Sequence, residues 1–332
     1  MHISHVERPA LMARQEKSRS VHVVLRTANE RTVFISEALV RAQCPPDVGV
    51  TLIKERPFEK ALRACYQAGL DAGQRWTITV DADVMILPGA IKGLVKSAET
   101  MPQCNVQLEG RVFDKVLGVY RPAGLRIYRT DLLHRAMRFI PPMGQTIRPE
   151  YETLLAMGRL GFPSRFVPDI FALHDFEQFY IDLYRKAYVH AYKHSWLVSD
   201  LLKRCRDYLK NDPDFLILLK GLWDGLTMND AVSIDCSLFK EKAVKALQEL
   251  GFREKEPINV EEFLESFRTF SSEATRGYTV PPKDTCDTPV LQPLPHGFRD
   301  SVINRTRKRG FLRGSVASFG AFLAKIGRAL DS

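Results

Sequence analysis

The stretch WTITVDADVMI, residues 76–86, decides the fold class of this chain of 332 residues. Its apolar and β-branched residues predict a single strand over 76–86, in which two aspartates, Asp81 and Asp83, follow the apolar run TITV. In an extended strand, residues two apart point to the same side, so we expect both carboxylates to face one site. A solvated turn capped by an aspartate is the alternative interpretation of this spacing.

Two strand–helix pairs precede this stretch. VHVVLRT at 21–27 predicts a strand, followed by a helix over 33–43. VTLIKE at 50–55 predicts a second strand, followed by a helix over 58–71. A third helix is expected to end near Glu99. Three such units with short connections predict an α/β fold with a parallel sheet covered by helices, an architecture typical of nucleotide-binding proteins.

The regular alternation ends after this third unit. Strand-like pieces within 105–130 predict a mixed or antiparallel section, and a strand ending at His174 leads into a long helix. Further helices are expected up to residue 270, and five prolines in the segment after them predict an extended linker. The predicted organisation is a flexible N-terminus (1–19), an α/β domain (20–200), a helical extension (201–280), a proline-rich linker (281–298) and a basic amphipathic tail (299–332).

Composition excludes several classes of protein. Hydrophobic residues at 45% and charged residues at 26% are typical of a globular protein and exclude collagen and wholesale disorder. The six cysteines are scattered without a CxxC pair, which indicates reduced thiols in the cytoplasm and no structural zinc. No apolar stretch approaches the ~20 residues that span a bilayer. The prediction is a cytoplasmic protein.

The tail carries most of the positive charge. Eight basic and two acidic residues lie in 299–332, so this segment holds +6 of the net charge of +9. Its apolar residues recur at intervals of three and four: Leu312, Val316, Phe319, Leu323, Ile326 and Leu330. We predict that 303–332 binds an anionic membrane surface, attaching the protein peripherally to the inner face of the membrane. A helix that docks on the protein itself or on a partner chain is the alternative. Nucleic acid is not an expected partner.

Two motifs carry a resemblance to a known family. RTANERT (26–32) and VDADVMILPGAI (80–91) resemble GT-A-fold glycosyltransferases, in particular the bacterial family 2-like enzymes, over about residues 20–200. The resemblance implies a Rossmann-like nucleotide-diphospho-sugar transferase sheet, a nucleotide-sugar donor and a glycan or glycolipid acceptor. It also implies a divalent cation, Mn²⁺ or Mg²⁺, on the donor diphosphate, for which carboxylates are suitable ligands.

Positions in the family pattern imply individual roles. The metal ligands would be Asp81, Asp83 and His174, and the nucleotide-sugar contacts would come from Thr27, Asn29, Glu30, Glu55 and Asp81. At Glu55 this chain has Lys54-Glu55-Arg56 where the family often has an Asp-rich run. For the segment that contains His174, the alternative is a packed histidine followed by an aspartate that caps the long helix.

An inverting transfer requires a carboxylate that deprotonates the acceptor hydroxyl. The family places this acid at the start of a helix, where this chain has Arg148-Pro149-Glu150-Tyr151-Glu152. Glu150 is the preferred candidate and Glu152 the second, although acids in a first turn also stabilise any helix dipole. Three further residues lie on the acceptor side of the family pattern: Arg111, Arg126 and Tyr128.

The leading hypothesis is a metal-dependent, inverting glycosyltransferase of the hexosyltransferase type, acting in surface polysaccharide or glycolipid synthesis. The first alternative is a haloacid dehalogenase-type phosphohydrolase, with Asp81 as nucleophile and Asp83 as acid/base. That family uses a later acidic motif with a Gly-Asp pair, which this sequence lacks. A nucleotidyltransferase would share the sheet but should have a glycine-rich loop after the first strand. The segment TANERT (27–32), which follows that strand here, contains no glycine. The alternative outside enzymology is a non-catalytic, membrane-associated scaffold with the same fold.

Overall fold

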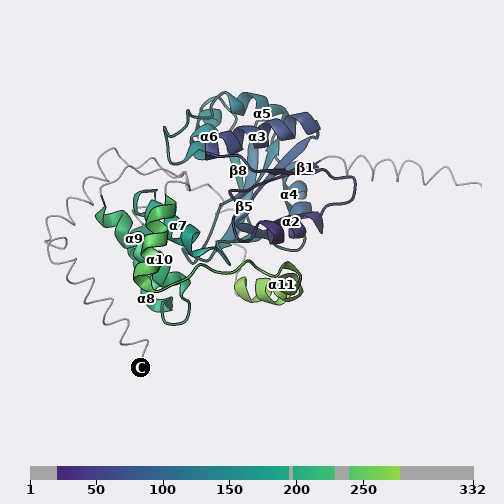
Figure 1. Cartoon of the computed structure of the whole chain (residues 1–332). Helices are drawn as coiled ribbons and strands as arrows, with labels where there is room; N and C mark the ends of the chain where they lie inside the picture. The colour runs from purple at the N-terminus through teal and green to yellow at the C-terminus, as the bar shows by residue number, and fades with distance from the viewer. Residues whose placement is uncertain (1–20, 194–196, 229–238, 277–332) are drawn as a thin grey trace, which may run out of the picture.

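The computed structural model describes residues 21–193, 197–228 and 239–276 (Figure 1). The predicted N-terminal segment 1–19, the linker 281–298 and the tail 299–332 lie outside these residues. The described chain forms an eight-stranded mixed sheet in the order β2-β1-β3-β7-β5-β8-β4, with β6 paired to β5. Helices cover both faces of this sheet (Figure 1). The predicted α/β class is confirmed.

The first part of the sheet is parallel, as predicted. β1 (Val21–Arg26) lies between β2 (Val50–Ile53) and β3 (Trp76–Asp81), and all six residues of β1 are buried. The intervening helices are α2 (Val33–Arg41) and α3 (Phe58–Ala72). α3 ends at Gly73, whose φ of 63° is the left-handed conformation that glycine adopts without a steric penalty.

The single strand predicted over 76–86 is wrong, because the chain turns in the middle of it. β3 ends at Asp81, and β4 (Val84–Ile86) begins a separate strand that pairs with β8 at the far edge of the sheet. Two side chains near the start of α2 hold this turn: the hydroxyl of Thr32 donates to the carbonyl of Ala82 at 2.7 Å, and that of Ser36 donates to Val84 at 2.6 Å. The alternation of side chains along β3 therefore does not continue to Asp83.

The second part of the sheet is mixed, also as predicted. β7 (Leu125–Arg129) runs antiparallel to both β3 and β5 (Gln107–Asp114), and β8 (Ser164–His174) runs parallel to β5. β6 (Val119–Arg121) returns antiparallel along β5. The helices in this part are α4 (Ala90–Glu99), α5 (Thr130–Met137), which was not predicted, and α6 (Pro149–Arg159).

Apolar clusters fix these helices on the sheet. Residues of α3, α5 and α6 pack with Tyr128 of β7 on one face, whereas α2 and α4 pack on the other (Figure 1). Burial of apolar surface is the main stabilising contribution in such layers. The sheet is thereby held rigidly between helices, and the ends of its strands are available to form a site.

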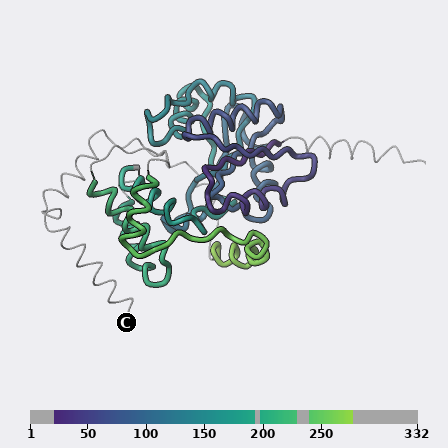
Figure 2. Tube along the Cα trace, in the orientation of Figure 1, coloured from purple at the N-terminus to yellow at the C-terminus, as the bar shows by residue number. Residues whose placement is uncertain are grey.

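A group of helices follows the sheet. α7 (Tyr180–Lys193), α8 (Val198–Tyr208), α9 (Asp214–Thr227) and α10 (Lys240–Leu250) share one apolar cluster. The chain then crosses to α11 (Val260–Ala274), which packs on α2 (Figure 2). Lys115, just after β5, binds Asp214 of α9 at 2.6 Å and so links the helices to the sheet. Within the described ranges, no helix combines the length and apolar character needed to cross a membrane.

Candidate active site

The pairing of β8 with its two neighbours assembles the site. His174 of β8 lies opposite Val84 of β4 on one side and opposite Asp114 of β5 on the other. Because β4 and β8 are antiparallel, the residue before Val84 lies against the residue after His174. Asp83 and Asp175 are therefore neighbours, and the backbone amide of Asp175 donates a hydrogen bond to the carbonyl of Asp83 at 3.2 Å.

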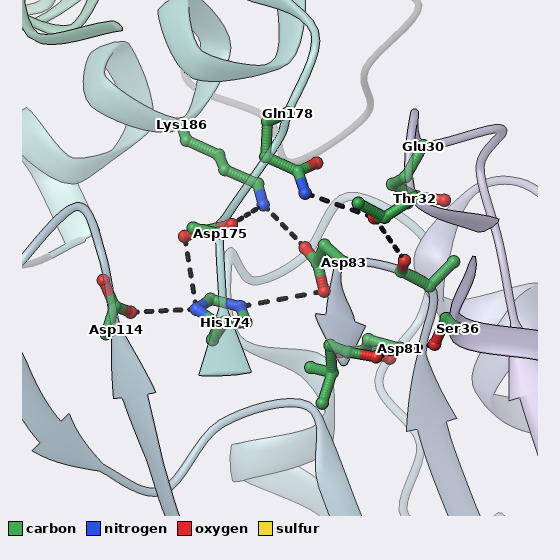
Figure 3. Close-up of polar contacts among 12 residues, drawn as sticks. Glu30, Thr32, Ser36, Asp81, Asp83, Asp114, His174, Asp175, Gln178 and Lys186 are labelled. Carbon is green, nitrogen blue, oxygen red and sulfur yellow. Dashed lines mark hydrogen bonds and ion pairs between the residues drawn. The ribbon is translucent and has the colours of Figure 1, made fainter. Parts of the chain in front are cut away.

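Asp83, His174 and Asp175 form a group of side chains that could hold a metal ion (Figure 3). One ligand atom from each lies within 4.8 Å of the others. Asp175 has a φ of 62°, a left-handed conformation that is uncommon for a residue with a side chain and recurs at functional sites. Asp83 and His174 were predicted as ligands. Asp175 was not predicted. Asp81, the third predicted ligand, is not a member of this group.

Asp114 fixes the orientation of the His174 ring. Its Oδ2 lies 2.9 Å from Nδ1 of His174 and 2.6 Å from a guanidinium nitrogen of Arg121, and its side chain is fully buried. Burial raises the pKa of Asp114, but Arg121 and His174 hold it well below its ordinary value. With Nδ1 engaged, Nε2 is the nitrogen that faces Asp83. A carboxylate on the far ring nitrogen is the usual partner of a metal-binding histidine.

The donor atoms of this group fit a divalent cation. Among the described residues, no hydrogen-bond donor reaches Oδ1 of Asp83, although this atom is buried. It lies 3.7 Å from Nε2 of His174, which is too far for a hydrogen bond. Two carboxylates supply the oxygen ligands that Mg²⁺ and Mn²⁺ prefer, and a neutral imidazole can complete the set.

Lys186 of α7 lies against the same carboxylates. Its ammonium is 2.6 Å from Oδ2 of Asp83 and forms a second ion pair with Asp175 (Figure 3). Burial lowers the pKa of Lys186, but Asp175 and Asp83 together raise it above its ordinary value. Conversely, burial raises the pKa of Asp83, whereas Lys186 and His174 hold it below its ordinary value. This lysine is therefore charged and bound to two of the three candidate ligands.

A separate polar cluster surrounds Asp81. The guanidinium of Arg26 forms an ion pair with Asp81, its neighbour across the parallel ladder of β1 and β3. The same guanidinium lies 3.0 Å from Glu150 and 4.5 Å from the centre of the Phe58 ring. The carboxylates of Asp81 and Asp83 thus bind different partners, although burial and the negative charge of Asp83 raise the pKa of Asp81.

Glu150 is enclosed by positive and hydrogen-bonding side chains. Its carboxylate accepts hydrogen bonds from Arg26 at 3.0 and 3.3 Å, from Arg126 at 2.7 Å and from the hydroxyl of Tyr128 at 2.7 Å. Burial raises the pKa of Glu150, but Arg126 and Arg26 lower it to about 2. Glu152, the second predicted catalytic acid, is exposed in the same first turn of α6.

The residues predicted on the acceptor side lie in two different places. Arg126 and Tyr128 belong to the Glu150 cluster. The guanidinium of Arg111 instead lies over the ring of Phe166, 5.6 Å from its centre. Two of the three residues therefore contact the predicted catalytic helix, and the third packs on β8.

Four of the five residues predicted to contact the nucleotide lie on loops after β1 and β2, and the fifth, Asp81, ends β3. The carboxylate of Glu30 accepts a hydrogen bond from the hydroxyl of Thr27 at 2.7 Å, so the first loop is braced internally. Burial and the nearby Asp83 raise the pKa of Glu30. Asn29 is exposed with a φ of 71°, and Glu55 is exposed beyond the end of β2. Both loops follow carboxyl ends of parallel strands, where sheets of this kind bind ligands.

Sequence reasoning missed four residues of the site. Arg26 had a local signal, since it is a charged residue at the end of a strand that is otherwise apolar apart from His22. Asp175 directly follows the predicted ligand His174, but an aspartate before a long helix is also typical of a helix cap. Asp114 and Lys186 had no local signal, because only strand pairing and helix packing bring them to His174 and Asp83.

No family model and no curated protein matches this sequence. Among solved structures, the chain is similar to the mannosyltransferase PcManGT from Pyrobaculum calidifontis in complex with GDP-Man and Mn²⁺. The two are 15% identical, the match covers 80% of this chain and 89% of the mannosyltransferase, and the TM-score is 0.38. For TarS from S. aureus the identity is 11%, the coverage 75% of this chain and 92% of TarS, and the TM-score 0.36.

A glycosyltransferase involved in glycosylation of the major capsid of PBCV-1 is 12% identical, with a TM-score of 0.34. That match covers 46% of this chain and 91% of the glycosyltransferase. Likeness at TM-scores of this size assigns no chemistry, which has to come from the side chains of the site.

Proposed function

We propose that this chain is a metal-dependent glycosyltransferase that moves a sugar from a nucleotide-sugar donor to an acceptor hydroxyl. The observation that carries the proposal is the group of Asp83, His174 and Asp175, with ligand atoms within 4.8 Å of one another at the end of the sheet. Asp114 lies 2.9 Å from Nδ1 of His174 and so orients the ring, as the carboxylate behind a metal-binding histidine does. A bound Mn²⁺ or Mg²⁺ would neutralise the charge that develops on the departing diphosphate.

The nucleotide would lie beside this group, over the loops after β1 and β2. Thr27, Asn29 and Glu30 on the first loop and Glu55 after the second strand are the proposed contacts. Asp81 is the proposed contact to the ribose, because its side chain is 24% exposed while its ion pair with Arg26 fixes its position. A loop already braced by hydrogen bonds loses little conformational entropy when a ligand binds.

The two catalytic candidates have different surroundings. The carboxylate of Glu150 is occupied by two arginines and a tyrosine, and a pKa of about 2 makes it a weak proton acceptor at neutral pH. Its contacts favour a role in positioning Arg26 and Arg126. Glu152 is exposed on the same helical turn and is the better candidate for the base of an inverting transfer.

The site contacts disfavour the phosphohydrolase alternative. In that mechanism Asp81 would attack phosphorus, but its carboxylate is held in an ion pair with the buried guanidinium of Arg26. Asp83 would have to exchange protons, yet it is ion-paired with Lys186.

Under the transferase proposal, the tail at 303–332 would bring the site to a membrane-borne glycan or glycolipid acceptor.

A thermal-shift screen tests the proposed function. UDP-, GDP-, CMP- and dTDP-sugars are added with and without Mn²⁺, since a ligand that binds only the folded state raises the melting temperature. One donor should raise the melting temperature of the full chain in a Mn²⁺-dependent way. Asp71→Asn, which changes an exposed aspartate of α3, is the control and should show the same shift of the melting temperature as wild type. If no donor shifts the melting temperature under either condition, the non-catalytic scaffold becomes the better account.

A further inference from the structure

We propose that Lys186 acts as a resident counter-cation of the metal site, so that the divalent cation binds strongly only together with a nucleoside diphosphate. This inference rests on the proposed function and goes beyond it by assigning a residue that controls metal entry. Lys186 would leave the ligands Asp83 and Asp175 when the metal binds, and its ammonium would then pair with the diphosphate.

The position of the Lys186 ammonium carries the first step. It lies 2.6 Å from Asp83 and is also ion-paired with Asp175, so it occupies oxygens on two of the three candidate ligands. Only 11% of the Lys186 side chain is exposed, and Asp175 is 1% exposed. An ion pair this far from solvent is screened much less than one at the surface. A divalent cation that enters must therefore displace the ammonium or bind beside it.

The backbone around Lys186 keeps the ammonium at this place. The neighbouring positions Leu183 and Ala187 are fully buried in the cluster shared by α7 and α9. The hydroxyl of Tyr184 donates a hydrogen bond to Asp224 of α9 at 2.7 Å. α7 is thus fixed, whereas the lysine side chain has a flexible four-carbon stem. The ammonium can move by side-chain rotation while the helix stays in place.

Electrostatics supplies the coupling. Without a ligand, the positive charge of Lys186 offsets Asp83 and Asp175 and repels a dication, which weakens metal binding to the free protein. A nucleoside diphosphate brings negative charge that attracts both the metal and the displaced ammonium. Metal and diphosphate therefore raise each other's affinity, by the same factor because binding linkage is reciprocal. Removing the charge of Lys186 should strengthen binding of the metal alone and reduce this coupling.

The test is a calorimetric titration of the full chain with Mn²⁺, alone and with saturating GDP or UDP. The loss of the free Mn²⁺ signal in electron paramagnetic resonance provides a second readout. Lys186→Met should bind Mn²⁺ alone more tightly than wild type, by about ten- to a hundredfold, the range expected for one charged hydrogen bond. The increase in Mn²⁺ affinity caused by nucleotide should fall by a similar factor.

Two further variants serve as controls and a third repeats the test. Lys186→Arg keeps the positive charge and should retain the wild-type coupling. Lys220→Met removes a lysine that is also bound to two carboxylates, Asp224 and Glu249, and should leave Mn²⁺ binding unchanged. Lys186→Gln removes the charge but keeps hydrogen-bond donors, so it should reproduce the gain in Mn²⁺ affinity if Lys186→Met proves too unstable to titrate.

The outcomes separate this inference from the proposed function. Unchanged or weaker Mn²⁺ binding in both Lys186→Met and Lys186→Gln overturns the role of Lys186, even where wild type binds metal and nucleotide. If GDP or UDP binds but Mn²⁺ binds neither wild type nor the variants, the inference fails and nucleotide binding stands. If neither ligand binds any of these proteins while they remain folded, the inference and the proposed function fail together.

Discussion

The backbone amide of Asp175 donates a hydrogen bond to the carbonyl of Asp83 at 3.2 Å. This bond continues the antiparallel pairing of β4 and β8 by one residue pair, and it joins the turn after β3 to the end of the sheet's last strand. The carboxylates of both residues then reach the same ammonium, and they face different nitrogens of His174, Asp83 at 3.7 Å from Nε2 and Asp175 at 3.2 Å from Nδ1. The candidate metal site is therefore a property of the sheet's edge, with ligands whose spacing is set by strand pairing.

Replacing a single ligand should abolish metal-dependent nucleotide binding. Asp83→Asn and Asp175→Asn each remove one of two carboxylate ligands, so calorimetry with Mn²⁺ and GDP or UDP should show no metal-dependent heat. Circular dichroism should show that the fold is kept. Asp71→Asn, an exposed aspartate of α3, should bind as wild type. Unchanged Mn²⁺-dependent affinity in Asp83→Asn contradicts the assignment of the metal site.

Asp114 should affect the metal affinity of the site without being a ligand. Asp114→Asn weakens the acceptor that holds Nδ1 of His174, and loss of such a partner typically lowers metal affinity by about 10- to 100-fold. The Mn²⁺ affinity of this variant, measured in the presence of nucleotide, should fall in that range, whereas His174→Ala should abolish the metal-dependent binding. Equal affinity in Asp114→Asn and wild type would show that ring orientation does not depend on this contact.

Glu150 should contribute stability that depends on pH. Its pKa in the folded protein is about 2 against an ordinary 4.5, so the contribution is present above pH 4.5 and is lost as the pH falls toward 2. From the size of this shift, Glu150→Gln should lower the free energy of unfolding at pH 7 by on the order of 3 kcal/mol. Urea unfolding of both proteins should show the difference shrinking by about 1.4 kcal/mol at pH 3.5. A difference that stays constant from pH 7 to 3.5 contradicts the ion-pair account.

Glu152 should act on the chemical step and leave stability unchanged. If it is the base, Glu152→Gln lowers kcat by about 10²- to 10⁴-fold, the usual contribution of general-base catalysis. The exposed position predicts that the melting temperature and the donor affinity stay at wild-type values. Full activity of this variant would mean that the base lies elsewhere or that the anomeric configuration is retained.

The segment 303–332, which lies outside the described residues, should bind membranes. Each basic residue near an anionic surface contributes about 1 kcal/mol, and burial of the apolar stripe adds to this. In flotation with anionic liposomes, the full chain should float at low salt, and a chain that ends at Leu291 should stay in the soluble fraction. If both stay soluble, the tail docks on the protein or on a partner, and a soluble acceptor becomes the better proposal.

The sequence by itself determined the features that depend on near neighbours along the chain. The apolar runs of β1 and β3, the apolar spacing of α3 with Gly73 after its end, and Pro149 at the start of α6 all have local causes, namely burial, helical periodicity and the backbone preferences of glycine and proline. Asp83 could be selected because it follows an apolar run at a two-residue spacing from Asp81, and His174 because its position matches the family pattern.

Only the tertiary structure decided which side chains meet. The hydroxyls of Thr32 and Ser36 hold the turn that separates β3 from β4, so Asp81 pairs with Arg26 while Asp83 turns toward His174. Lys186 reaches Asp83 because α7 packs back against the end of the sheet. Such contacts join residues far apart in sequence, and their geometry depends on strand register and helix packing, which local periodicity does not encode.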